Sequence, residues 1–333
     1  MNIPEKVKNN ARKIIKNCCA TKKGERVIII TDTEQPAFIA RALHDCVLEC
    51  EGVPLIITME KCLPGNPLPL AIEKALEEAD IIVTPTTTSI YHSESIHKAC
   101  ARENNPARLL ALSECSEDMM SGGGIDMDFL AVKPVVDKVG FYYEKGRKIS
   151  YKTPAGTDIT ASIASRPVCL NDGLSHKGGQ KNGIPTLEVF IAPVEESVNG
   201  KIVVDASCSG GVGKIVDKPI EITVVNGKAT EITGGVEAEK LKKILASAGT
   251  DAVYQVAELA IGLNPYCRIT GNIVEDEGKY GTCHMALGSN TGFYGKNFAP
   301  LHIDMVQYAP TIVIDGTVIC ENGELKVAQM IGF

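Results

Sequence analysis

Two short segments near the end of the 333-residue chain contain histidines in surroundings that are typical of a metal site. His284 lies in GTCHMALG, where glycines and small neighbours leave room for an ion or a substrate. His302 lies two residues before Asp304 in HID. On an extended strand these two side chains point to the same face, so an imidazole and a carboxylate can hold one metal ion. Taken alone, each segment is equally compatible with a surface pair or a core histidine.

Two glutamates interrupt apolar segments of the second half. Glu188 lies in IPTLEVFIAP and Glu258 lies in VAELAIGLNP. A buried carboxylate is costly unless it is paired or bound to a metal. Each glutamate is therefore either a metal ligand or a residue that caps a helix, forms a salt bridge or lies on an exposed edge.

The segments IPTLEVFIAP, VAELAIGLNP, EDEGKYGTCHMALG and HID follow one another in this order. Together they resemble the motifs of the aminopeptidase T and S family of metallo-aminopeptidases. The resemblance extends into the first half through GERVIIITD and EADIIVTP, so it covers most of the chain. It implies that one or two divalent ions (Mn, Co, Zn or Fe) are held by five residues: Glu188, Glu258, His284, His302 and Asp304.

The reaction that this resemblance implies is hydrolysis. Metal-bound hydroxide would attack the carbonyl of a peptide, an amide or a small cyclic substrate, with Glu258 as the general base. Thr291 stands where the peptidases have a catalytic tyrosine, and the replacement candidate is Tyr294, three positions later. Arg166 could bind a substrate carboxylate through its guanidinium group, or form a structural ion pair. Glu275 and Glu277 precede His284 and resemble a family segment near the site, so we expect them to have a role beside the ligands or at the substrate rather than as ligands.

Two other functions stay open. A shorter branch with the same fold resembles 2,5-dihydroxypyridine 5,6-dioxygenase, in which one iron is held by two histidines and an aspartate; here these would be His284, His302 and Asp304. The two additional glutamates and the twelve cysteines favour the hydrolase, because so many thiols fit poorly with an enzyme that uses oxygen. The missing tyrosine at Thr291 also allows a family member that binds a metal or ligand without turnover.

The elements that must position these residues fall into two lobes. Residues 1–148 alternate β-rich runs with helical periods, which predicts an α/β lobe with a parallel sheet. Residues 149–333 contain short strands separated by NG and DG turns, which predicts a β-rich α+β lobe that carries the metal. Two helices are expected there, at 237–249 and 251–262, and the second would place Glu258 near its end.

Composition narrows the class of protein. A net charge of −7 and a pI near 5.5 argue against a nucleic-acid partner. The N-terminal segment lacks the apolar core of a signal peptide, and no apolar run is long enough to cross a membrane. The cysteines form no CxxC pair, which indicates a reducing compartment. We therefore expect a cytoplasmic enzyme with a small-molecule or peptide substrate, and the family resemblance allows a homodimer.

Overall fold

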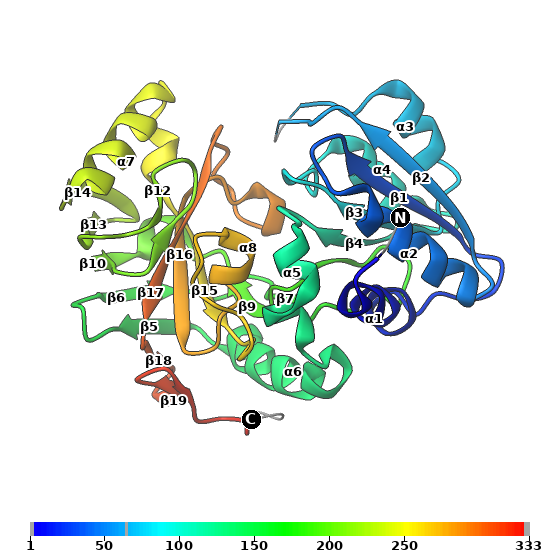
Figure 1. Cartoon of the computed structure of the whole chain (residues 1–333). Helices are drawn as coiled ribbons and strands as arrows, with labels where there is room; N and C mark the ends of the chain where they lie inside the picture. The colour runs from blue at the N-terminus through cyan, green and yellow to red at the C-terminus, as the bar shows by residue number, and fades with distance from the viewer. Residues whose placement is uncertain (1–2, 64–65, 330–333) are drawn as a thin grey trace. The chain divides into compact units, whose positions relative to one another are not determined.

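The computed structural model describes residues 3–63 and 66–329 (Figure 1). The chain divides into two compact units, one made of residues 1–131 and 171–185 and the other of residues 132–170 and 186–333. The domain boundary expected after residue 148 stays a prediction, because a division into compact units does not show which stretch folds independently. In the described parts of the chain, no helix is both long and apolar enough to span a membrane.

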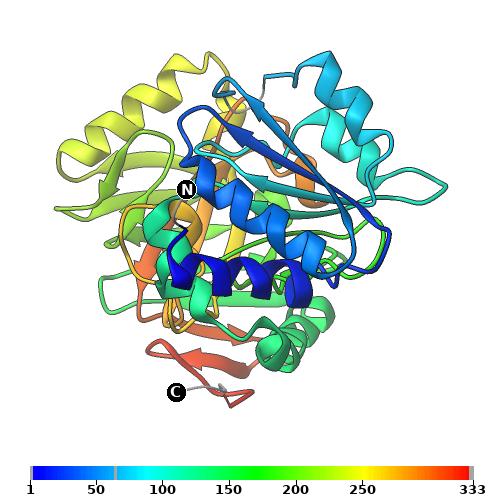
Figure 2. The same ribbon diagram turned by 45° about the vertical axis from the view of Figure 1, so that its right-hand side comes forward.

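The first unit is a parallel sheet with helices on both faces, as predicted. The strand order is β2-β1-β3-β4-β8. Ile28 and Ile30 of β1 belong to one apolar cluster with residues of α3 and α4, whereas Val27 and Ile29 point to the other face, against which α2 packs. Figure 2 shows α1 and α2, in two shades of blue, side by side. The strands are β1 (Arg26–Asp32), β2 (Val53–Met59), β3 (Ile81–Pro85), β4 (Arg108–Leu112) and β8 (Lys181–Gly183). The helices are α1 (Glu5–Lys13), α2 (Ala37–Glu49), α3 (Leu70–Leu76), α4 (Glu94–Cys100) and α5 (Glu117–Ser121).

The second unit is rich in antiparallel strands, which confirms the predicted β-rich lobe. One sheet has the order β14-β13-β10-β6-β5-β18-β19-β20 and the other β12-β11-β17-β16-β15-β9-β7. Asn226 and Gly227 join β13 to β14 with φ values of 48° and 81°, the backbone that an NG hairpin turn requires. The first sheet contains β5 (Lys148–Lys152), β6 (Asp158–Ser162), β10 (Asn199–Val204), β13 (Ile220–Val225), β14 (Lys228–Thr233), β18 (Thr311–Ile314), β19 (Thr317–Glu321) and β20 (Glu324–Leu325).

The second sheet carries the predicted ligands. Its strands are β7 (Cys169–Asn171), β9 (Glu188–Ile191), β11 (Ser207–Cys208), β12 (Gly213–Ile215), β15 (Val256–Gly262), β16 (Thr282–Gly288) and β17 (His302–Tyr308). The remaining helices are α6 (Phe129–Lys145), α7 (Val236–Ser247) and α8 (Ile273–Asp276).

The helix predicted at 251–262 is wrong. A short 3-10 turn, Asp251–Tyr254, is followed by strand β15, which places Glu258 within a strand instead of at the end of a helix. Every residue of β15 is buried, and the strand lies in the interior of its sheet between β16 and β9. A continuous apolar run of this kind has neither alternation nor a polar face, so its pattern does not distinguish a central strand from a buried helix.

Candidate functional site

The five predicted ligands lie on four neighbouring antiparallel strands, in the order β17-β16-β15-β9. Asp304 lies opposite Ala286, and Ala286 lies opposite Glu258 on its other side. His284 lies opposite Ala260 in the same register. Because side chains alternate between the faces of a strand, this register places all the predicted ligands on one face: Glu188, Glu258, His284, His302 and Asp304. Small alanines between them leave space above the sheet.

Glu277 joins this group, although the sequence reading gave it no ligand role. A Cβ atom added to Gly262 would lie 2.3 Å from the carbonyl oxygen of Lys279 and 2.7 Å from that of Glu277. Only glycine therefore allows the segment 277–279 to cross the end of β15. That crossing brings the Glu277 carboxylate near the predicted ligands. The sequence signal was the acidic EDEG segment just before His284, but the contact itself depends on long-range packing.

Glu258 lies between the two imidazoles. Its Oε1 is 3.3 Å from His284 Nε2, and its Oε2 is 3.3 Å from His302 Nε2. Glu188 Oε2 is also 3.3 Å from His284 Nε2, and Asp304 Oδ1 is 3.0 Å from His302 Nε2. Glu188, Glu258 and His284 are buried, whereas the His302 side chain is 30% exposed. The open side of the cluster is therefore at His302.

The cluster offers three overlapping sets of donor atoms. Within each set, the three donor atoms lie within 4.8 Å of one another. His284, His302 and Asp304 do not form such a set by themselves, and each set includes at least one glutamate. The sets are Glu188, Glu258 and His284; Glu258, His302 and Asp304; and Glu277, His284 and Asp304.

The hydrogen bonding of His302 is that of a metal ligand or of a doubly protonated imidazole. His302 Nδ1 lies 2.8 Å from the carbonyl oxygen of Ser289, and a carbonyl oxygen only accepts, so Nδ1 carries a proton. The other nitrogen, Nε2, faces the carboxylates of Glu258 and Asp304. A lone pair directed at carboxylate oxygens is repulsive unless a second proton or a metal ion lies there. Metal-binding histidines commonly donate their other N–H to a backbone carbonyl, which is the arrangement seen here.

The ionisable groups of the metal-free cluster have strongly shifted pKa values. Desolvation lowers the pKa of His284, but its hydrogen bond with Glu258 and the charge of Glu188 outweigh that effect and raise the pKa to about 9. Desolvation raises the pKa of Glu277 well above its ordinary value, and the nearby negative charges of Glu188 and Asp304 raise it further. The cluster thus contains more carboxylates than imidazoles, and a divalent cation would compensate the excess negative charge.

The remaining predicted site residues lie outside the cluster. Tyr294 has a left-handed backbone (φ 71°) and a side chain that is 63% exposed. Thr291 is exposed as well, and its hydroxyl group lies 3.4 Å from that of Ser289. Arg166 forms an ion pair with Glu195 and donates to the carbonyl oxygen of Tyr294, 2.8 Å away. These contacts are those of a structural pair, so catalysis by Tyr294 and substrate binding by Arg166 stay predictions.

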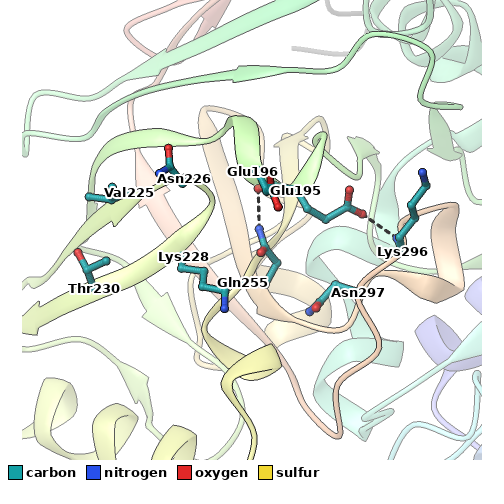
Figure 3. A pocket seen from close by; sticks show the side chains of 9 residues that line it. All are labelled: Glu195, Glu196, Val225, Asn226, Lys228, Thr230, Gln255, Lys296 and Asn297. Atoms are coloured by element: carbon teal, nitrogen blue, oxygen red, sulfur yellow. Dashed lines mark hydrogen bonds between the residues drawn. The ribbon is translucent and has the colours of Figure 1, made fainter.

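A separate cavity in the second unit contains none of the cluster residues. Its volume is about 770 Å³, and Figure 3 shows the side chains around it. They are mainly polar and come from hairpin β13–β14, from the loops that follow β9 and β16, and from the residue before β15: Glu195, Glu196, Val225, Asn226, Lys228, Thr230, Gln255, Lys296 and Asn297. We take the cluster as the functional site, because it holds the convergent donor atoms and the perturbed ionisable groups.

Comparisons with known proteins agree in pointing to one family. A family model described as 2,5-dihydroxypyridine 5,6-dioxygenase matches residues 10–327. The protein of that name from Pseudomonas putida KT2440 is 26% identical over 292 residues, which cover 81% of this chain and 77% of that protein.

Two solved structures have the same fold. The structure of 2,5-dihydroxypyridine dioxygenase from Pseudomonas putida KT2440 aligns with a TM-score of 0.83 and 19% identity, covering 97% of this chain and 98% of that one. Wild-type AmpT from Thermus thermophilus aligns with a TM-score of 0.69 and 16% identity, covering 96% and 98%. At these identities the two likenesses establish the fold alone.

The family match corrects the expected reaction. The prediction of an aminopeptidase-like hydrolase is wrong, because the matched family and the matched protein are dioxygenases. The role of Glu258 as the base for a hydrolytic attack fails with it. The alternative weighed from the sequence, a ring-cleaving dioxygenase, is the reading that the comparisons favour. Metal binding and ring cleavage, which were also expected, fit this family.

Proposed function

Because the chain belongs to the 2,5-dihydroxypyridine 5,6-dioxygenase family, we propose that it is an iron-dependent dioxygenase that opens a dihydroxylated pyridine ring. The observation that carries this proposal is the gathering of two imidazoles and several carboxylates on one face of the second sheet. The family implies a divalent metal and a small-molecule substrate. The expected homodimer and the cytoplasmic location stay predictions.

The donor set suits iron(II). Two imidazoles and one carboxylate on one face leave positions for substrate and oxygen, which is the ligand pattern of non-haem iron oxygenases. We assign the iron to His284, His302 and Asp304 together with Glu258, because each compact set of donor atoms includes a glutamate and the Glu258 carboxylate lies 3.3 Å from both imidazoles. When bound, iron(II) supplies the one-electron chemistry that dioxygen needs to react with an aromatic ring.

The two remaining carboxylates, those of Glu188 and Glu277, are available to bind the substrate beside the metal. A ring with two hydroxyl groups must be oriented, and carboxylates accept hydrogen bonds from hydroxyl groups. Glu188 and Glu277 lie next to His284 and are not required by the assigned iron set. We therefore assign them to the hydroxyl groups of the substrate. Because the His302 side chain is 30% exposed, we place the entry of the substrate on the His302 side of the cluster.

Oxygen uptake tests the proposed function. Protein purified without oxygen would be loaded with iron(II), and in parallel with Mn, Co or Zn, and then mixed with 2,5-dihydroxypyridine and dioxygen. We expect one dioxygen consumed per ring, both oxygen atoms in the opened product when labelled gas is used, and activity with iron alone. Iron-loaded protein that binds the ring but consumes no oxygen would contradict the proposal.

A further inference from the structure

The rings of Phe190, Phe293 and His302 contact one another in sequence beside the face of the second sheet that carries the candidate ligands, which we call the metal face. The rings of Phe190 and Phe293 have centroids 5.5 Å apart at an interplanar angle of 73°. The rings of Phe293 and His302 have centroids 5.7 Å apart at 85°. Both are edge-to-face contacts, in which the edge of one ring meets the face of the other. Phe293 therefore connects a metal-binding imidazole to a second phenyl group.

Both phenyl groups belong to the face that carries the metal ligands. Phe190 lies two residues after Glu188 on β9 and opposite Ala260 of β15, so it points the same way as the ligands. Phe293 ends a 3-10 turn, Thr291–Phe293, in the connection between β16 and β17. Both side chains are half-buried, so part of each ring stays accessible next to the metal site.

The turn that carries Phe293 is held by a buried ion pair. The Arg166 and Glu195 side chains are only 9% and 18% exposed. Arg166 donates to the carbonyl oxygen of Tyr294, 2.8 Å away. Glu195 accepts from the backbone N–H of Lys296 at 2.7 Å. The pair thus holds the backbone on the C-terminal side of Phe293 through two hydrogen bonds.

We propose that Phe190 and Phe293 form the apolar wall against which the substrate ring packs, and that the Arg166–Glu195 pair positions Phe293 for this contact. The inference rests on the proposed function, since it supposes an aromatic substrate. A dihydroxypyridine has polar oxygens at its edge and apolar faces. The metal and the carboxylates meet the edge, whereas half-exposed phenyl groups beside them offer surface for the face of the ring.

Two probes separate this role from general damage to the site. The first is 2,5-dihydroxypyridine, titrated without oxygen so that no turnover occurs. The second is oxalate, which binds metals through two oxygens but has no ring. Both would be titrated calorimetrically into the iron-loaded wild type and into Phe293→Leu and Phe190→Leu. We expect Phe293→Leu to bind the ring roughly tenfold more weakly, with oxalate affinity and iron content unchanged.

Each outcome supports or overturns a stated claim. If Phe293→Leu binds the ring as tightly as the wild type does, or loses equal affinity for both probes, the proposed packing of the ring against the phenyl groups is wrong. The proposed function would still stand. A wild type that binds oxalate but not dihydroxypyridine overturns the proposed function, and with it the ring contact.

A double-mutant cycle tests the positioning by Arg166. Arg166→Met, and Arg166→Lys as the charge-conserving variant, would be combined with Phe293→Leu. If Arg166 acts through Phe293, its loss weakens ring binding in the wild type but causes no further loss in Phe293→Leu. Oxalate affinity should not change in any variant. Additive losses, or iron content that falls with Arg166, would show that the pair only supports the fold.

Discussion

The buried Arg108–Glu25 pair of the first unit has matched charges, whereas the charges on the metal face of the second unit are unmatched. Arg108 is 6% exposed, and its guanidinium group meets both oxygens of Glu25 at 2.9 and 2.7 Å. It also donates to the carbonyl oxygen of Cys19. One cation thus faces one anion, and the neighbouring polar groups are satisfied. Such a pair is complete without any other partner.

The metal face has a different arrangement of charge. Four carboxylates surround two imidazoles, and each imidazole faces carboxylates on more than one side: Glu188, Glu258, Glu277 and Asp304 around His284 and His302. A fold gains nothing from such an excess of negative charge, because like charges repel when desolvated. The difference teaches that the balance of buried charge, rather than burial itself, separates a structural ion pair from a cation site.

The strongest way to break this comparison is to remove a proposed ligand. We expect His302→Ala and Asp304→Ala to lower metal affinity by more than roughly 100-fold, since even residues behind metal ligands contribute about 10- to 100-fold. Elemental analysis of the purified variants and oxygen uptake measure the loss. His44→Ala is the matched control, because His44 Nδ1 also lies 3.0 Å from an aspartate, Asp45. Full metal content in either ligand variant would refute the cation site.

Removing the metal should affect the two regions unequally. A ligand that binds only the folded state stabilises it by about 4 kcal/mol at a concentration 1,000 times its dissociation constant. We therefore expect chelation to lower the melting temperature of the wild type but not that of Asp304→Ala. Hydrogen exchange should speed up first in strands β15, β16 and β17 rather than in β1 or β3. Uniform loss of protection in both sheets would contradict the local role of the metal.

The sequence predicted the elements whose patterns are local. The strands and helices from β1 to β4 have short β-branched runs that alternate with helical periods, and each is present. The NG and DG turns at residues 226–227, 315–316 and 322–323 formed hairpins, since their residues tolerate positive φ. Strand β15 was mistaken for a helix, because a strand that is buried on both faces lacks the alternation of apolar and polar residues that identifies a strand. Helix α6 was not predicted; Pro134 lies inside it.

The ligand set was predicted through motif order, but its surroundings were not. Glu277 depends on a backbone crossing that only Gly262 permits, and no spacing in the sequence reveals that contact. Phe293 was overlooked in favour of its neighbour Tyr294, whose left-handed backbone leaves the phenol exposed. These positions are decided by packing between distant segments, which one sequence does not encode in a readable way.

The cysteine count favoured the wrong reaction. It counted against oxygen chemistry, yet most of the thiols are buried in the structure. Burial raises the pKa of Cys19 to about 12, and likewise that of Cys320 to about 12. The thiolate is the form that reacts with oxidants, so these buried neutral thiols are inert. A high cysteine content is therefore compatible with an oxygen-using enzyme.

Removing one carboxylate from each region sharpens the comparison. Glu25→Gln leaves the Arg108 guanidinium buried without its anion, so we expect a loss of about 3 kcal/mol in the free energy of unfolding. Glu277→Gln in the metal-free protein removes a group from an excess of like groups, so we expect less than about 1 kcal/mol of change, or a gain. Urea unfolding of chelated protein measures both. Equal losses would mean that the cluster is balanced without a cation.

The smallest expected effect concerns a matched but half-exposed pair in the first unit. Burial raises the pKa of Asp80, but hydrogen bonds from the side chain and backbone of Arg26 and from Asn105 outweigh it and lower the pKa to about 2. A lowered carboxyl pKa stabilises the fold above the ordinary value of 3.8 and loses that contribution as the pH falls through about 2. Because the Arg26 side chain is 42% exposed, solvent screens the pair, and Asp80→Asn should cost only about 1 kcal/mol at pH 7. Urea unfolding of both proteins should show the difference shrinking below pH 4. A difference that persists at low pH would mean that Asp80 acts through its shape rather than its charge, which would remove it from the set of matched ion pairs.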